Sequence, residues 1–450
     1  MLDRSAPPRL WPVAWPLGIE LLLGIGIGIV GTALAARGGD TEAAAFGLVN
    51  HVNAMLFVLF RIVAVGSGVV VTQNLGGGRP NRAAALARTA LGANTWMGAA
   101  CALAALLGAG PLLRMMNAPA DVLPHAQPFL QMLAPALLLD AQHATMVGVL
   151  RAHLRARLAL TVILSMQAVQ LLLAVVLMTG VGGLPALGLP GFAVAVTVSR
   201  AWSVLLLHLL WRSKLETRPR WSDLWRLRRE DLAAVLHIGL PGAAENIAYR
   251  GAFMVSLAVV ATLGARALAT HAYAMQAAYL CLIFGLATGF AVELLVGHLV
   301  GAGRLHDAFQ LVRRSLARGL VVAMGVTVLI ALAGPWLMRV FTDEPAVLGA
   351  AIALLWWNLL VEPGRVFNLV VINALRSAGD ARYPVAAGAA SMLVVLAGGS
   401  WLLGSVLGLG LPGVWIAYAA DEWVRGLLMW RRWVGLGWVP HARAARRRVR

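Results

Sequence analysis

The chain has 450 residues, of which 60% are hydrophobic and only 12% are charged, and its mean hydropathy is +0.79. So few polar residues cannot cover a water-soluble protein of this length, and the composition therefore indicates an integral membrane protein. The formal net charge is +18, but the arginines fall in every second loop, which is the pattern of loops on the inner side of a membrane. We therefore expect membrane lipids, and no nucleic acid, as partners.

About twelve apolar runs are long enough to cross the hydrocarbon core as helices, since each crossing needs about 20 residues. The short alternating segments of a transmembrane barrel do not occur. The two cysteines, Cys101 and Cys281, both lie inside apolar runs and give neither a disulfide framework nor a metal-binding spacing. The sequence predicts an all-α integral membrane fold with twelve transmembrane helices.

The first half sets the expected orientation. Arg4 and Arg9 precede the first apolar run, residues 12–36, so the N-terminus should be cytoplasmic. The third run is expected to end near Gly110-Pro111, and the fourth reaches Arg151 on the inner side. The fifth and sixth runs are joined by an uncharged Gly/Pro turn at residues 180–191, which predicts an outer loop.

Residues 212–231 differ in composition from the rest of the chain. Arginines surround Trp221, Leu224 and Trp225 at helical spacing, which predicts an amphipathic helix lying on the inner leaflet. We interpret this segment as a cytoplasmic linker between an N-terminal lobe, residues 1–211, and a C-terminal lobe, residues 232–450, that ends in a basic tail.

The second half of the chain repeats the first at a spacing of 225 positions (241 − 16). The matched elements are Pro16 with Pro241, Glu20 with Glu245, Leu150-Arg151 with Leu375-Arg376 and, at a spacing of 222, Leu189-Pro190-Gly191 with Leu411-Pro412-Gly413. Duplicated architecture is common in secondary transporters.

Each half contains six apolar runs, an even number, so both halves should insert with the same orientation. We therefore predict two six-helix bundles related by a pseudo-twofold axis along the membrane normal, with a hydrated cavity between them. The C-terminus should also be cytoplasmic. We expect a multi-pass monomer in a bacterial inner membrane.

Four carboxylates lie inside apolar runs, namely Glu20, Asp140, Glu245 and Glu362. Each costs about 2.5–3.5 kcal/mol at a helix centre, so each should face a partner or a wet cavity. Glu245 is the favoured functional candidate, because only Arg250 lies near it and a spacing of five residues is poor geometry for a helical ion pair.

Local partners leave a structural interpretation open for the other three acids. Glu362 and Arg365 are three residues apart and could form an internal salt bridge. Asp140 could pair with His143, and Glu20 could latch the entrance of the first helix. Amphipathic groups in the seventh and eighth apolar runs suit a promiscuous pocket, although each alone is more often core packing: Tyr249, Tyr273, Tyr279, Gln276 and His271. Three asparagines in apolar runs are further candidate binding residues: Asn50, Asn246 and Asn368.

Three segments resemble hallmarks of the multidrug and toxic compound extrusion family. They are the twin helix-opening Pro-x-x-x-Glu, the loop Gln73-Asn74-Leu75-Gly76-Gly77-Gly78-Arg79, and Leu375-Arg376-Ser377-Ala378-Gly379-Asp380-Ala381-Arg382-Tyr383-Pro384. The resemblance covers nearly the whole chain. It implies two six-helix bundles that open outward as a V, and export of small organic cations in exchange for Na⁺ or H⁺, with no cofactor besides the coupling ion.

Two positions depart from the family pattern. Many members carry an Asp late in the first helix where this chain has Gly31, and others carry a Glu where it has Tyr249. The coupling acid is therefore not transferred from the family, and Glu245 and Glu362 are hypotheses.

Other classes of function remain as alternatives. A lipid-linked precursor flippase of the same broad superfamily would need a cationic groove, and Arg61 and Arg250 lie inside apolar runs. An integral-membrane enzyme is disfavoured by the short loops and scattered histidines, and we expect the chain not to be an enzyme. A nucleotide-driven pump is disfavoured because no Gly-x-x-x-x-Gly-Lys-Ser/Thr occurs.

Overall fold

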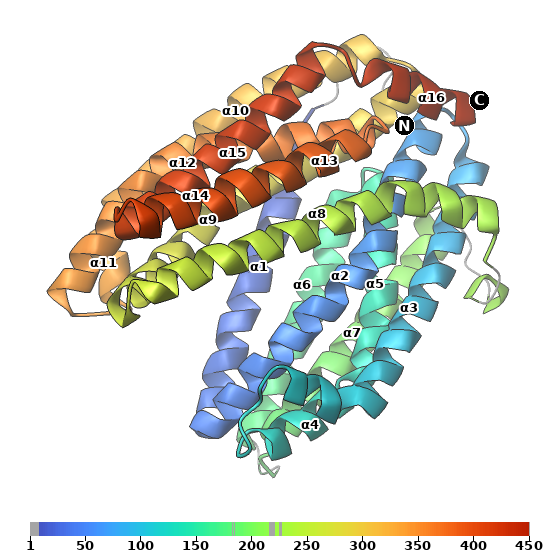
Figure 1. Cartoon of the computed structure of the whole chain (residues 1–450). Helices are drawn as coiled ribbons and strands as arrows, with labels where there is room; N and C mark the ends of the chain where they lie inside the picture. Colours follow the sequence, from blue (N-terminus) through green and yellow to red (C-terminus); the bar gives the residue numbers. More distant parts are fainter. Residues whose placement is uncertain (1–8, 182, 184, 216–220, 225–226, 450) are drawn as a thin grey trace. The chain divides into compact units, whose positions relative to one another are not determined.

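The structure is a computed structural model that describes residues 9–181, 183, 185–215, 221–224 and 227–449. These residues form helices and connecting turns, with no strand among them (Figure 1). Nine of the described helices are long and apolar enough to cross a membrane, or ten if one bent pair is a single span. Two further long helices, Arg229–Thr262 and Gly410–Val434, carry more charge. With the bent pair counted as one span, the described helices give the twelve that the sequence predicts.

The helices of the first half follow one another with short connections. They are α1 (Trp11–Ala36), α2 (Asp40–Gly76), α3 (Pro80–Met115), α4 (Leu123–Met132), α5 (Ala134–Ala152), α6 (Ala156–Thr179) and α7 (Leu189–Lys214), followed by the short 3₁₀ helix η1 (Trp221–Leu224). The two halves of the bent pair are α4 and α5, which meet at 47°. Pro135, in the first turn of α5, has no amide hydrogen to continue the α4 ladder, so the break falls there.

The prediction that the third helix ends near Gly110-Pro111 is wrong, since α3 continues through Pro111 to Met115. Leu113 in this extra turn is fully buried in the core of the first half. Its burial offsets the backbone hydrogen bond that Pro111 removes. At the equivalent Gly334-Pro335 the helix does break, and a short helix begins there.

The second half repeats this order. Its helices are α8 (Arg229–Thr262), α9 (Ala265–Ala302), α10 (Leu305–Leu332), α11 (Gly334–Arg339), α12 (Pro345–Ser377), a span made of α13 (Arg382–Ser391), η2 (Met392–Gly398), α14 (Gly399–Trp401) and η3 (Leu402–Val406), then α15 (Gly410–Val434) and α16 (Val439–Val449). Within the α13–η3 span, η2 and η3 are π-helical, a geometry that is frequent near functional sites.

The chain forms two compact units, each described here by itself. Unit 1 contains residues 1–18, 76–78 and 241–450, and unit 2 contains residues 19–75 and 79–240. Of the predicted amphipathic linker, residues 221–224 are η1, which packs against α3 in unit 2. Residues 216–220, 225 and 226 lie outside the described part. The lobe boundaries 1–211, 212–231 and 232–450 stay a prediction.

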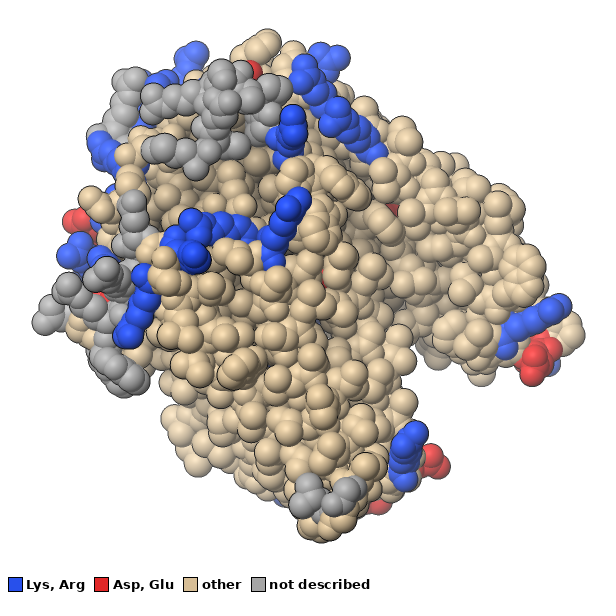
Figure 2. All heavy atoms as spheres, turned by 180° about the vertical axis from the view of Figure 1, so that it is seen from behind, with Lys and Arg blue, Asp and Glu red and all other residues tan. Residues whose placement is uncertain are grey.

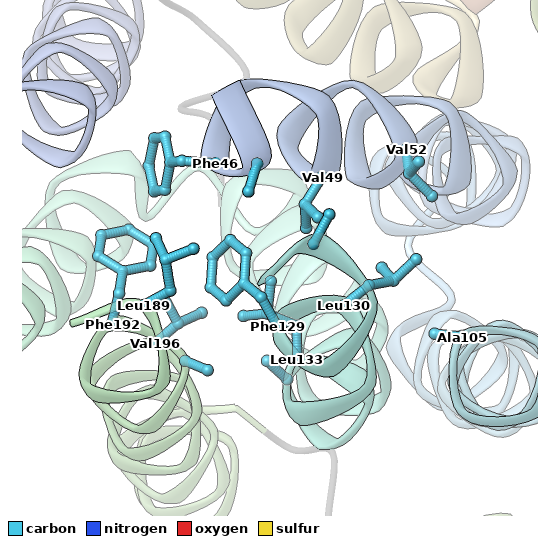
Figure 3. Packing of buried hydrophobic residues seen from close by; sticks show 14 of the residues in the cluster. Phe46, Val49, Val52, Ala105, Phe129, Leu130, Leu133, Leu189, Phe192 and Val196 are labelled. Carbon is cyan, nitrogen blue, oxygen red and sulfur yellow. The ribbon is translucent and has the colours of Figure 1, made fainter. Parts of the chain in front are cut away.

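Unit 2 is built around an aromatic cluster from three helices (Figure 3). The ring of Phe46 on α2 lies 4.9 Å from that of Phe192 on α7 in an edge-to-face arrangement, and 6.0 Å from that of Phe129 on α4. Such arrangements contribute about 0.5–1.5 kcal/mol each beyond the area they bury. The cluster fixes the ends of α2, α4 and α7 against one another.

The surface agrees with the composition. Figure 2 shows that most of the face in view carries no charged side chain. Many large apolar side chains are exposed, among them Leu107, Val321 and Leu329. Apolar surface on this scale requires a bilayer around it.

Candidate functional site

The strongest concentration of buried charge lies in unit 1, between α12 and α15. Glu362 on α12 is completely buried and accepts a hydrogen bond from Arg365 Nη1 at 2.9 Å. The structure therefore shows the internal salt bridge that the spacing of three allows. It does not leave Glu362 satisfied, because the second carboxylate oxygen, Oε1, has no hydrogen-bond partner.

Three residues of α15 complete this cluster. Glu422 lies 3.5 Å from Arg365 Nε and accepts a 3.0 Å hydrogen bond from Asn368, one of the predicted site residues. Arg425 binds Asp421 at 2.7 Å and Glu422 at 3.1 Å. Sequence reasoning missed these three residues, although the adjacent pair Asp421-Glu422 inside an apolar run is the signal that would have found them.

The buried charges of this cluster do not balance. Three carboxylates, Glu362, Asp421 and Glu422, face two guanidinium groups, Arg365 and Arg425, which leaves one surplus negative charge. An uncompensated charge in this setting is costly, so the surplus must be met by a proton or another cation. We call these five residues the unit 1 charge cluster.

A small cavity opens beside the unit 1 charge cluster. It measures about 10 Å³, which is space for about one water molecule. Its lining includes Tyr249, Phe253, Tyr418 and the acids of α15. Tyr249 lies with its ring centroid 5.9 Å from the Arg425 guanidinium. In this chain α12 and α15 therefore supply the acids, and α8 supplies an aromatic ring.

Unit 2 holds a counterpart of this cluster with inverted polarity. Asp140 on α5 accepts a 2.5 Å hydrogen bond from Arg200 on α7. At the repeat spacings of 225 and 222, Asp140 corresponds to Arg365 and Arg200 to Glu422. The same two helices are thus joined by an ion pair in both units, but the acid and the base have exchanged helices.

The expected pair of Asp140 with His143 is wrong. His143 forms a hydrogen bond of 2.7 Å with Ser203 instead, because the Asp140 carboxylate is already paired with the guanidinium of Arg200. The unit 2 pair is also electrically neutral. The positions that correspond to Glu362, Asp421 and Arg425 are Leu137, Ser199 and Ser203, so the surplus charge is confined to unit 1.

A second repeated pair joins the first helix of each half to the fourth. Arg376 on α12 donates to Glu245 on α8 at 2.7 Å, and Arg151 on α5 donates to Glu20 on α1. The expectation that Glu245 lacks a cationic partner apart from Arg250 is wrong, because the partner comes from another helix, 131 positions away. Glu20 does hold α1 in place, as the sequence allows, because it forms an ion pair with Arg151 on α5.

Four further predicted site residues have other contacts or are exposed. Asn246 donates to the Gly242 carbonyl of its own helix, and Tyr273 stacks on Phe341 at 5.3 Å. Asn50 and Gln276 are exposed on α2 and α9. The structure therefore brings together Glu362, Arg365, Asn368 and Tyr249 of the predicted set.

The packing around Gly31 leaves no space for an acidic side chain at this position of α1. A Cβ at this position would lie 2.8 Å from Phe46 and 3.2 Å from Phe192, two rings of the cluster in Figure 3. The space that an Asp would need is filled by aromatic rings. Among the described residues, no group of three His, Cys, Asp or Glu side chains is arranged to hold a metal ion.

Two repeated six-helix units with charged side chains buried inside them define a multi-pass membrane transporter built by internal duplication. A family model, MatE, matches this chain twice, over residues 16–177 and 241–401. The chain therefore belongs to the MatE family, the multidrug and toxic compound extrusion transporters that the sequence motifs resemble.

Similar proteins cover nearly the full length. The chain is 30% identical to the uncharacterized transporter YisQ of Bacillus subtilis over 97% of this chain and 96% of that protein. It is 27% identical to a probable multidrug resistance protein NorM of Rhodopseudomonas palustris, over 94% and 90%. An outward-facing multidrug resistance MATE family transporter of the MOP superfamily shares the fold, with a TM-score of 0.87 at 18% identity over 97% and 96% of the chains.

Proposed function

We propose that the protein exports organic cations across a bacterial inner membrane in exchange for H⁺ or Na⁺, and that the unit 1 charge cluster takes up the coupling ion. The observation that carries the proposal is the surplus negative charge of this cluster, with Glu362 Oε1 free of a partner. Two similar proteins are named as multidrug resistance proteins, and these names support the proposed substrate class.

The geometry favours a proton over Na⁺ as the coupling ion. A proton needs only one free carboxylate oxygen, and Glu362 Oε1 provides it. The neighbouring cavity of about 10 Å³ is too small for a hydrated metal ion. With its proton, Glu362 brings the cluster to neutrality. Without it, the cluster attracts an organic cation.

Glu362 lies at a position where α12 can bend, so a change in its charge can be linked to a movement of this helix. Pro363 follows it directly inside the helix and interrupts the backbone hydrogen-bond ladder there. Bending α12 at this point therefore breaks fewer hydrogen bonds than bending it elsewhere. A change in the attraction between Glu362 and Arg365 acts at the weakest point of the helix, and alternating access in this proposal uses that bend.

Transport in proteoliposomes tests the proposal. Export of a fluorescent organic cation is measured under a pH gradient or an Na⁺ gradient, each imposed alone. Glu362→Gln should abolish the dependence on the pH gradient, because the amide cannot take up the ion. Wild-type protein should hold about a tenfold cation gradient per pH unit, equivalent to about 1.4 kcal/mol.

Glu344→Gln is the matched control, since Glu344 pairs with Arg266 on the exposed surface. It should leave ion dependence unchanged. Export by Glu362→Gln that follows the pH gradient as wild-type protein does would exclude the cluster as the coupling site. Export that responds to neither gradient in wild-type protein would contradict antiport itself.

The flippase alternative depends on a cation inside the apolar runs. Arg250 is exposed on α8, whereas Arg61 makes contacts of its own within the structure. If Arg250→Ala removes function while Glu362→Gln retains it, a phosphate-bearing lipid precursor becomes the better substrate.

A further inference from the structure

A cavity of about 910 Å³ lies in unit 1 between the start of α1 and the N-terminal part of α10. Arg9, just before α1, and Trp11, its first residue, line one side of the cavity, and Arg314 and Arg318 line it from α10. The two α10 arginines are four residues apart and therefore share one face of the helix. The volume is in the range of pockets that hold small organic groups.

The charge in this cavity is not compensated by the residues that the structure describes. Arg9, Arg314 and Arg318 are all exposed, and no described carboxylate pairs with any of them. The one acid in the lining, Asp307, is held by Arg304 at 2.7 Å. The cavity is therefore a basic pocket whose arginines have no carboxylate partner among the described residues. We call it the α1–α10 groove.

The internal repeat shows what fills the equivalent place in unit 2. In unit 2, the helix equivalent to α10 is α3, and Arg82 and Thr89 on α3 both bind the carboxylate of Asp231. Asp231 belongs to the first turn of α8, the helix equivalent to α1. Val235, one turn further along α8, packs into the same place and is fully buried.

Unit 1 lacks the acid. At the repeat spacing of 225, Asp231 corresponds to Ala6, whereas Val235 corresponds to Leu10, which lines the groove. Thr89 and Ala93 correspond to Arg314 and Arg318, and Arg82 corresponds to Asp307, which pairs with Arg304. Unit 1 therefore has two additional arginines on α10 and no counterpart of the Asp231 carboxylate, so this place is open to an anion from outside the described chain.

The surroundings of the α1–α10 groove identify the class of anion. Trp11 is 69% exposed at its mouth, and Leu10 and Leu311 add apolar walls. Exposed tryptophan beside arginine is typical of the level of lipid headgroups. The arginine-rich start of α10 is predicted to lie on the cytoplasmic side, where the leaflet is rich in anionic lipid.

We propose that the α1–α10 groove binds the phosphate headgroup of an anionic phospholipid. Arg314 and Arg318 donate to the phosphate oxygens, Arg9 closes the site from α1, and Trp11 lies at the boundary between headgroup and acyl chains. This site lies apart from the unit 1 charge cluster and does not depend on the transported cation.

Lipid binding by the full-length protein in neutral detergent micelles tests the assignment. Retention of phosphatidylglycerol and of phosphatidylcholine is measured by native mass spectrometry. Wild-type protein should retain phosphatidylglycerol preferentially. The double variant Arg314→Gln/Arg318→Gln should weaken that retention by about tenfold to a hundredfold, because each guanidinium–phosphate contact is a charge-assisted hydrogen bond.

Arg313→Gln is the matched control, since Arg313 is exposed on α10 but does not line the groove. It should bind phosphatidylglycerol within about twofold of wild-type protein, a difference well below one lost contact. Arg9→Gln tests the same site without altering α10, and it should weaken retention by about tenfold. Should the α10 double variant fail to fold, Arg9→Gln decides the matter by itself.

Two kinds of result would overturn the assignment. The first is a failure of selectivity, namely equal retention of the two lipids by wild-type protein, or a loss in Arg313→Gln as large as in the double variant. The second is stabilisation of lipid-free protein by millimolar inorganic phosphate that also displaces phosphatidylglycerol, which would make soluble phosphate the occupant.

Discussion

Arg376 reaches Glu245 across 131 positions of sequence, and Arg151 reaches Glu20 across the same interval in the other half of the chain. The two ion pairs join the first and fourth helices of their respective repeats. An interaction kept in both copies of a duplicated chain, between helices that are distant in sequence, is a structural element of the fold.

Replacement of Glu245 by Gln should destabilise the protein more than replacement of Glu20 by Gln. The side chains of the Glu245 pair are 13% and 10% exposed, against 21% and 25% for the Glu20 pair. A lost partner should therefore cost about 2–4 kcal/mol in the first pair and about 1 kcal/mol in the second. Denaturant unfolding in mixed micelles measures both. Equal losses would mean that burial does not set the strength of these pairs.

Exchange of Asp140 and Arg200 should be tolerated. Each single variant, Asp140→Arg or Arg200→Glu, places like charges together and should cost about 3 kcal/mol. The double variant reproduces the polarity of Arg365 and Glu422 in unit 1 and should recover most of that loss. Thermal unfolding of the three variants gives the coupling energy. If the double variant lost as much stability as the two single variants together, unit 2 would not accept the ion pair with the acid and the base exchanged.

Gly31→Asp should destabilise the C-terminal end of α1, and it should not add a coupling site. The new Cβ would crowd Phe46, and the carboxylate would be surrounded by aromatic rings, so a loss of at least about 2 kcal/mol is expected. The losses caused by Gly31→Asp and Phe46→Ala should add to less than their sum in the double variant, because removal of the ring makes the space that the new side chain needs. Gly28→Ala, where nothing lies within 4 Å, is the control and should be neutral or stabilising. Unchanged stability in Gly31→Asp would contradict the packing around it.

Gly66→Ala and Gly68→Ala should have opposite effects, although the two residues are two positions apart on α2. A Cβ at Gly66 would meet the backbone carbonyl of Val235 on α8, and a Cβ at Gly239 would meet that of Ile62 in return. Gly66→Ala should therefore cost about 1–3 kcal/mol. Gly68 has nothing within 4 Å, so its substitution should gain about 0.5–1 kcal/mol of helix propensity. The same unfolding measurement decides between them.

The twelve helices and the repeat could be predicted because hydrophobic length and residue type are local properties of a sequence. Pro16 with Glu20 and Pro241 with Glu245 mark equivalent helix starts without any knowledge of packing. The end of α3 was misplaced because a proline weakens a helix locally, whereas the burial of Leu113 that carries the helix onward depends on the whole unit 2 core.

The candidate site was only partly predictable for the same reason. Glu362 and Arg365 were found as a pair because three residues separate them, a spacing that a helix translates directly into contact. Glu245 was assigned no partner because Arg376 comes from another helix. Side chains that meet across helices are set by the fold, and only the repeat, which matches Arg151 with Arg376, hinted at that contact.

The single surplus charge in unit 1 also determines how the proposed exchange responds to voltage. If one proton enters the cluster for each monovalent cation that leaves, one cycle carries no net charge across the bilayer. A membrane potential then does no work on the cargo, and a cell that keeps its potential but loses its pH difference would lose this route of export.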